Sequence, residues 1–157
     1  MKPVTVTVDV PQPREAVYEF LAVLANHESF TRPMLVDYRC SGPERGVGSK
    51  VRVTAVMGRV RSTADITVIE DVPSARTVEE NVSANGKRRA TGTYELEPAP
   101  GGGTRVSFTY AWQRAPFGDR IAAPLVRAMM RRGLRQTLDR LAQQLAPSAG
   151  ARSTDAA

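Results

Sequence analysis

Residues 106–145 read VSFTYAWQRAPFGDRIAAPLVRAMMRRGLRQTLDRLAQQL, and this stretch decides the fold because its hydrophobic period changes within it. Up to Trp112 every second residue is apolar or aromatic, which is the pattern of a strand with one buried face. From Phe117 onward the apolar residues recur at helical spacing, on an arc about 100° wide. That arc holds Ala123, Val126, Met130, Leu134, Thr137, Leu141 and Leu145. The stretch therefore predicts a strand followed by one long amphipathic helix.

The residues before this stretch predict the surface on which the helix packs. Alternating patterns indicate further strands near residues 4–10, 34–41, 50–57, 60–66, 78–82 and 90–96. One or two short helices are expected after the first strand, between residue 13 and Pro33. The links between the later strands are short, which favours an antiparallel meander. The predicted fold class is α+β, with an antiparallel sheet of about seven strands around a long C-terminal helix.

Two hairpins allow the strand register to be predicted. Gly58-Arg59 fits a two-residue turn, which places Met57 opposite Val60 and Val51 opposite Ile66. For the Asn85-Gly86 turn we predict a three-residue loop, Ala84-Asn85-Gly86. That loop places Val78, Glu80 and Val82 on the inner face of their strand, with Arg88 opposite Val82.

Composition places the chain among ordinary globular proteins. It has 157 residues, 41% hydrophobic and 24% charged, and a net charge of +6. We expect one domain over residues 1–146 and a disordered tail over 147–157. Because there is a single cysteine, Cys40, and no stretch resembling a signal peptide, a cytoplasmic location is expected.

No specific catalytic motif is present. One histidine, His27, and one cysteine are too few for a structural zinc site, so no metal and no cofactor are expected. His27 itself is interpreted as a surface or pocket-rim residue. Glu80 is the candidate for chemistry because its predicted inward position would bury a carboxylate, within reach of Arg88. The alternative is that Glu80 lies at a solvated sheet edge.

Six segments match a known family in their order along the chain: the first strand at residues 4–10, Pro13 to Leu24, Asn26 to Phe30, Gly46-Val47-Gly48-Ser49, Gly92 to Pro98 and Gly103 to Val106. Their order, completed by the terminal helix, resembles the polyketide cyclase/dehydrase and lipid-transport family. That family belongs to the helix-grip superfamily together with START domains, and it often has Trp where this chain has Phe30. The resemblance implies a curved sheet gripping the helix, with a cavity between them for a lipid, sterol or polyketide-like molecule.

Binding of a small hydrophobic or amphipathic ligand in such a cavity is the leading functional hypothesis. The inward aromatic residues would line the cavity, although in a solid core they would only fill it. The predicted lining is Phe30, Met34, Val53, Met57, Ile66, Val78, Glu80, Val82, Arg88, Tyr94, Phe108, Tyr110, Trp112, Val126, Met130 and Leu134. The alternative is a cofactor-free cyclase, aromatase or dehydratase that uses the same cavity, with Glu80 as acid or base.

A second alternative is a docking module. Residues 113–145 hold seven arginines and two acids, a net charge of +5. Arg120, Arg127, Arg131 and Arg135 form one flank of the helical arc, beside an apolar strip of Ile121, Leu125 and Met129. This surface could dock on an anionic membrane or a protein partner, or could simply be a solvated helix face. Nucleic acid binding is disfavoured because no aromatic-basic interleaving accompanies the charge, and a homodimer is left open.

Overall fold

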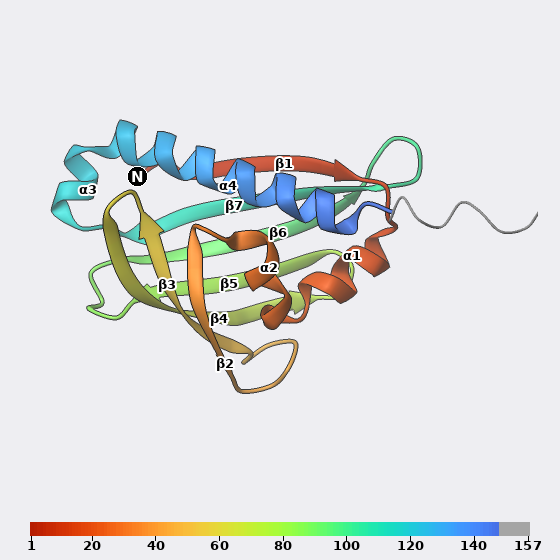
Figure 1. Cartoon of the computed structure of the whole chain (residues 1–157), viewed down its shortest axis with the longest axis horizontal. Coiled ribbons are helices and arrows are strands. Elements are labelled where there is room, and N and C mark those ends of the chain that lie inside the picture. The colour runs from red at the N-terminus through yellow and green to blue at the C-terminus, as the bar shows by residue number, and fades with distance from the viewer. Residues whose placement is uncertain (148–157) are drawn as a thin grey trace, which may run out of the picture.

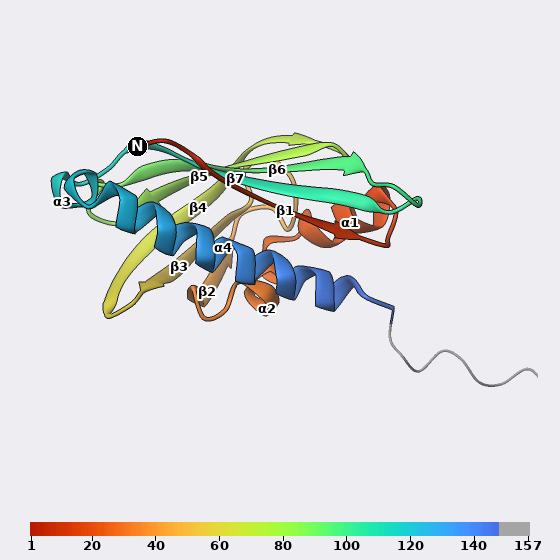
Figure 2. The same ribbon diagram turned by 90° about the horizontal axis from the view of Figure 1, so that it is seen from above.

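A seven-stranded antiparallel sheet wraps around one side of a long helix (Figures 1 and 2). The computed structural model describes residues 1–147. Its elements are β1 (Val4–Val10), α1 (Arg14–Leu21), the short 3-10 helix η1 (Leu24–His27), α2 (Glu28–Thr31), β2 (Leu35–Ser41), β3 (Lys50–Met57), β4 (Val60–Val72), β5 (Arg76–Ser83), β6 (Arg89–Pro98), β7 (Thr104–Arg114), α3 (Phe117–Ile121) and α4 (Ala123–Leu145). The predicted α+β class, strand number and long C-terminal helix are confirmed.

The sheet order is β1-β7-β6-β5-β4-β3-β2. The first strand, β1, is therefore an edge strand and pairs with the last strand, β7. Figure 2 shows the sheet as a curved layer with α1, α2 and α4 on the same side of it. The helix α4 contacts β1 and α2, which fixes it across the concave face. Proline at the first turn of α4 suits its start because that turn needs no backbone N–H donor.

The hydrophobic core divides into two clusters. The larger cluster joins β1, β6, β7 and α1 to the buried face of α4, and contains Phe30, Tyr94 and Leu134. The smaller one lies at the other end of the sheet and consists of Leu24, Val51, Val53, Ile66 and Val68. Both clusters form from the inward residues of alternating strands, and the space between them is where the candidate site lies.

The β3–β4 hairpin has the predicted register. Met57 faces Val60, Val53 faces Ala64 and Val51 faces Ile66, across the turn at Gly58-Arg59. Gly58 has a φ of 60°, a left-handed conformation that glycine adopts without strain.

The prediction for the β5–β6 hairpin is wrong, because its loop has four residues, 84–87. The Ser83 backbone N–H donates to the carbonyl of Arg88 at 3.0 Å, and Val82 lies opposite Arg89. The Asn85 side chain stabilises this longer loop by accepting hydrogen bonds from the Ser83 hydroxyl at 2.8 Å and from the Lys87 N–H at 3.0 Å. This register turns the side chains of Thr77, Glu79 and Asn81 inward. The alternate residues Val78, Glu80 and Val82 point outward.

The expected disordered tail, apart from Pro147, lies outside the described residues. Among residues 1–147, no helix combines the length and the apolar character needed to span a bilayer.

Candidate functional site

A cavity of about 110 Å³ lies between the sheet and α4, where the two core clusters face each other. Its walls come from η1, α2, from β2 to β7, and from α4, and they are mostly apolar. Ten of the sixteen predicted lining residues line it: Met34, Val53, Met57, Ile66, Arg88, Tyr94, Phe108, Tyr110, Met130 and Leu134.

Three predicted residues of β5 do not reach the cavity because the opposite face of this strand points inward. Val78, Glu80 and Val82 lie on the outer side of the sheet. The Glu80 carboxylate accepts a hydrogen bond from Nε of Arg89 at 3.0 Å, so it forms a surface ion pair and not the predicted pair with Arg88. The Arg88 guanidinium instead donates to Asp119 of α3, with Nε 3.1 Å from Oδ2.

Three further predicted residues belong to the core or its edge. Phe30 is fully buried and packs against the rings of Phe20 and His27. Trp112 is buried against the ring of Tyr110, with 5.0 Å between ring centroids. Val126 is half-buried near the start of α4. None of the three lines the cavity.

Glu79 and His27 form the most unusual feature of the cavity wall. Glu79 and His27 are 4% and 5% exposed, and Oε1 of Glu79 lies 3.6 Å from Nδ1 of His27. The other imidazole nitrogen, Nε2, lies 2.8 Å from the carbonyl oxygen of Leu21. A carbonyl only accepts hydrogen bonds, so Nε2 carries the proton and Nδ1 presents a lone pair toward Glu79.

Burial holds both groups in their neutral forms near neutral pH. Loss of solvation raises the pKa of Glu79 to about 8. The same loss of solvation lowers the pKa of His27 to about 4, against the opposing effect of its hydrogen bond to Leu21. Oε1 of Glu79 has no hydrogen-bond partner among the described residues, and the same is true of the Thr137 hydroxyl on α4. Two lining residues, one on β5 and one on α4, therefore carry a buried polar atom without a hydrogen-bond partner among residues 1–147.

Tyrosines complete the polar end of the cavity. The Thr31 hydroxyl donates to the carbonyl of His27 at 2.8 Å, so the Tyr38 hydroxyl, 2.9 Å away, donates to Thr31. Tyr94 packs edge-on against His27 with 5.6 Å between ring centroids, and burial raises its pKa well above the usual range. The Tyr94 contact and the bond from Nε2 to Leu21 fix the orientation of the His27 ring.

The glycine paired with Glu79 in the sheet makes room for an aromatic ring of the cavity wall. Gly92 pairs with Glu79 on one side and with Tyr110 on the other. A Cβ atom at Gly92 would lie 2.8 Å from Cζ of Phe108. Glycine therefore lets the Phe108 ring lie flat over the sheet beside the cavity.

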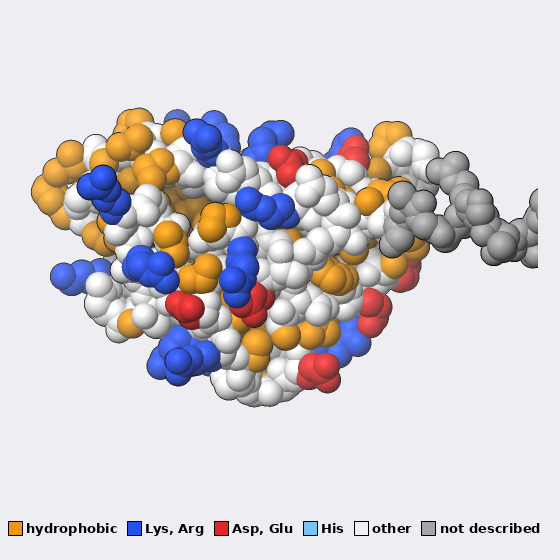
Figure 3. Space-filling model, in the orientation of Figure 1, with side chains coloured by type: hydrophobic (Ala, Val, Ile, Leu, Met, Phe, Trp, Pro, Cys, Tyr) orange, Lys and Arg blue, Asp and Glu red, His pale blue; other side chains and the backbone are white. Residues whose placement is uncertain are grey.

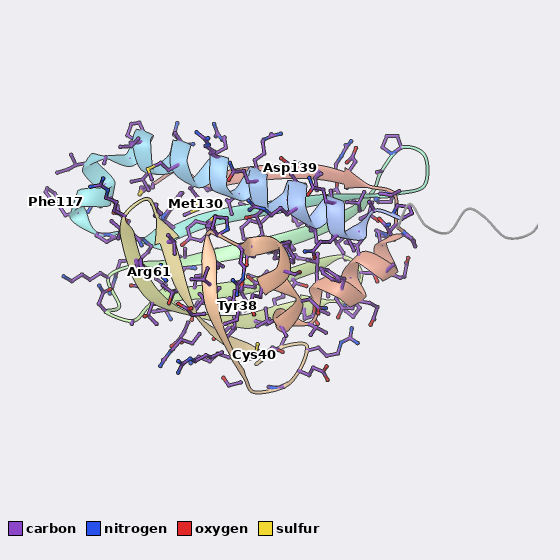
Figure 4. All side chains as sticks on the ribbon, in the orientation of Figure 1. Tyr38, Cys40, Arg61, Phe117, Met130 and Asp139 are labelled. Atoms are coloured by element: carbon purple, nitrogen blue, oxygen red, sulfur yellow. The ribbon has the colours of Figure 1, made fainter. Side chains whose placement is uncertain are left out.

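Methionines separate the cavity from a surface groove of about 450 Å³. Met34, Met57 and Met130 line both spaces, together with Val56. Met130, a residue of α4, lies near the tip of the β3–β4 hairpin (Figure 4). Because methionine side chains change rotamer readily, these three residues form a deformable mouth.

The predicted docking residues lie on two helices. Arg120 is on α3, whereas Arg131 and Arg135 are exposed on α4. Arg127 is half-buried, and its Nε donates to the carbonyl of Lys2 at 3.0 Å. Beside them, hydrophobic side chains gather at the α3 end of the molecule (Figure 3). The exposed apolar residues there are Phe117 at 75%, Ile121 at 70%, Leu125 at 62% and Met129 at 38%.

The residues that sequence reasoning misses are Glu79, Thr137 as a polar wall residue, and His27 as a buried group. The alternating polar run Thr77, Glu79, Asn81 is a usable signal. This polar alternation is easily overlooked, because the usual assumption that apolar residues point inward selects Val78 and Val82 instead.

A curved sheet closed by a long helix, with an apolar cavity between them, defines a helix-grip ligand-binding fold. The family model described as polyketide cyclase / dehydrase and lipid transport matches residues 1–146. The chain belongs to this family, as the resemblance implied.

Solved structures agree with the fold. The protein TTHA0849 of Thermus thermophilus shares 22% identity at a TM-score of 0.75, covering 92% of this chain and 97% of that one. The ZhuI aromatase/cyclase from Streptomyces sp. R1128 shares 16% identity at a TM-score of 0.67, covering 92% and 90%. The major latex-like protein 151 of Panax ginseng shares 9% identity at a TM-score of 0.71, covering 93% and 98%. No curated protein matches the sequence significantly.

Proposed function

We propose that the protein binds a compact hydrophobic or amphipathic molecule in the cavity between the sheet and α4. The observation that carries this proposal is the apolar cavity between two packed clusters, with the buried Glu79 and Thr137 oxygens left without partners among residues 1–147. Apolar walls provide affinity through buried area, at roughly 25 cal/mol per Å². A few polar groups then orient the ligand.

The size of the cavity narrows the ligand. A volume of about 110 Å³ is well below the roughly 300–1,000 Å³ of drug-sized sites. One ring or a small fused ring system is therefore the expected occupant of the cavity itself. A longer ligand, such as an isoprenoid, lipid or polyketide chain, would extend past Met34, Met57 and Met130 into the groove.

The polar groups suggest how the ligand lies. Glu79 and Thr137 would meet a hydroxyl or carbonyl group, and Glu79 takes the role first predicted for Glu80. Tyr94, Tyr110 and Arg88 also line the cavity and are candidates for specificity. The apolar part of the ligand would face Val53, Ile66 and the methionines.

Native mass spectrometry of the protein purified from its own cells tests this proposal, because a retained molecule reveals its own mass. Ala64→Leu adds three carbon atoms to the cavity wall and should reduce uptake at least about tenfold, since added bulk in a packed space is poorly tolerated. Ala128→Leu, on the exposed side of α4, is the matched control and should leave uptake unchanged. Equal uptake by both variants would reject the cavity as the binding site.

A second candidate function, docking on an anionic membrane, is favoured by the exposed strip Phe117, Ile121, Leu125 and Met129 beside Arg120 and Arg131. An apolar strip flanked by arginines complements a bilayer with anionic headgroups. Binding to vesicles containing phosphatidylserine should weaken as salt is added, and should fall when Ile121 and Leu125 are both changed to Ser. Absent binding, or binding that is insensitive to salt, would count against this candidate.

A further inference from the structure

The polar end of the cavity contains a carboxyl and an imidazole that ligand binding alone does not require. Both are buried and both line the cavity. With Nε2 of His27 committed to the carbonyl of Leu21, only Nδ1 can exchange a proton with Glu79. The 3.6 Å between Nδ1 and Oε1 is slightly longer than a hydrogen bond, so neither atom is committed to the other.

Proton counting shows why this arrangement is useful. One proton belongs to the pair, either on Glu79 as a carboxylic acid or on Nδ1 of His27 as an imidazolium beside a carboxylate. Both states have zero net charge, so moving the proton between them creates no isolated charge in the apolar cavity. The pair can therefore release a proton at one atom and accept another at its neighbour.

We propose that Glu79 and His27 are catalytic residues that transfer protons at the α-carbon of a compact ketone bound in the cavity. This inference rests on the proposed function, because the ketone must first occupy the cavity. The cavity suits such a substrate because its apolar walls would accommodate the carbon skeleton. Glu79, whose Oε1 has no partner among residues 1–147, lies in the cavity lining and would meet the carbonyl.

The step balances with these two residues alone. Glu79 donates its proton to the carbonyl oxygen, and Nδ1 of His27 accepts the proton from the α-carbon. The C–H electron pair becomes the carbon–carbon double bond of the enol, and the carbonyl π pair becomes the new O–H bond. An imidazolium and a carboxylate remain, and transfer of one proton from Nδ1 to Oε1 restores the starting pair.

The other titratable or charged side chains that line the cavity stay out of this exchange near neutral pH. Burial raises the pKa of Tyr110 to about 12 and raises the pKa values of Tyr38 and Tyr94 further. Arg88 is held by Asp119. The rate should therefore fall as the pH rises through the range near 8 in which Glu79 loses its proton.

The experiment uses 2-indanone, a compact ketone with acidic α-hydrogens, and follows their exchange for deuterium in D2O by proton NMR. We expect the full chain to accelerate exchange over buffer, and Glu79→Gln to reduce that acceleration about 100-fold or more. Glu80→Gln, the adjacent glutamate on the outer face, should exchange at the original rate. His27→Gln, which lacks the imidazole lone pair, should remove the acceleration even at the pH of maximal rate.

Binding of 2-indanone is measured in the same samples from the shifts of the cavity methionine methyl groups. If the ketone binds but exchanges at the buffer rate, or if Glu79→Gln is as fast as the original protein, the catalytic proposal is overturned and the binding function stands. If the ketone leaves those methyl groups unchanged and no molecule co-purifies, the proposed function fails together with the catalytic one. Glu79→Gln replaces an acid by a neutral isostere, so folding of this variant is expected.

Discussion

Two adjacent glutamates on β5 have opposite environments. Glu79 points inward, is 4% exposed and lies beside a neutral histidine. Glu80 points outward and forms an ion pair with Arg89 in contact with solvent. The comparison teaches that one residue of strand register separates a surface ion pair from a buried acid, because side chains alternate between the two faces of a strand.

The largest expected difference comes from reversing each charge. Glu79→Lys places an unpaired ammonium in the cavity wall and should lower the free energy of unfolding by about 3–5 kcal/mol. Glu80→Lys exchanges an exposed ion pair for an exposed repulsion with Arg89 and should lower it by about 1 kcal/mol or less. Urea denaturation of both variants measures the two values. Equal losses would mean that the two side chains share one environment.

A smaller effect should appear in the pH dependence of stability. The folded pKa of Glu79, about 8, lies above its unfolded value near 4.5, so between these values the folded protein binds the extra proton and stability falls as pH rises. Below about pH 6.5 the lowered pKa of His27 has the opposite effect.

Between pH 6.5 and 8 the Glu79 effect outweighs the remaining His27 effect, and the free energy of unfolding should fall by about 1 kcal/mol. Denaturation at the two pH values measures the change. Glu79→Gln should abolish the slope and Glu80→Gln should keep it. A slope that survives in Glu79→Gln would assign the titration to another group.

The smallest effect concerns the surface pair itself. A double-mutant cycle with Glu80→Ala and Arg89→Ala should give a coupling free energy below about 1 kcal/mol, because exposed ion pairs are screened by solvent. A coupling of several kcal/mol would show that Glu80, and not only Glu79, has an important partner.

The same strand shows how far the sequence can predict the site. The β3–β4 hairpin is predictable residue by residue because a two-residue turn leaves one register, and that register gives one consistent inner face. On β5 the usual rule selects the wrong face. Val78 and Val82 are outward, although Val78 is buried. The inner face carries Glu79 and Asn81, which border the cavity, and Thr77, whose hydroxyl donates to Asp71.

The long helix shows a complementary case. Its predicted arc contains Met130, Leu134, Thr137 and Leu141, which are all buried. The sequence could not show that Met130 and Leu134 border an unfilled space, because period alone reports which side is inward and not how closely the opposite wall approaches. The cavity volume depends on packing between distant segments, and so does the Thr137 hydroxyl, which has no partner among residues 1–147.

The position of a bound compact ketone tests the ligand site most directly. With 13C-labelled methionine methyl groups, 2-indanone should give intermolecular NOEs to Met57 and Met130, which line the cavity, and not to Met129, which lies outside it. NOEs confined to Met129, or none to any methionine while the ketone is bound, would contradict a ligand site between the sheet and α4.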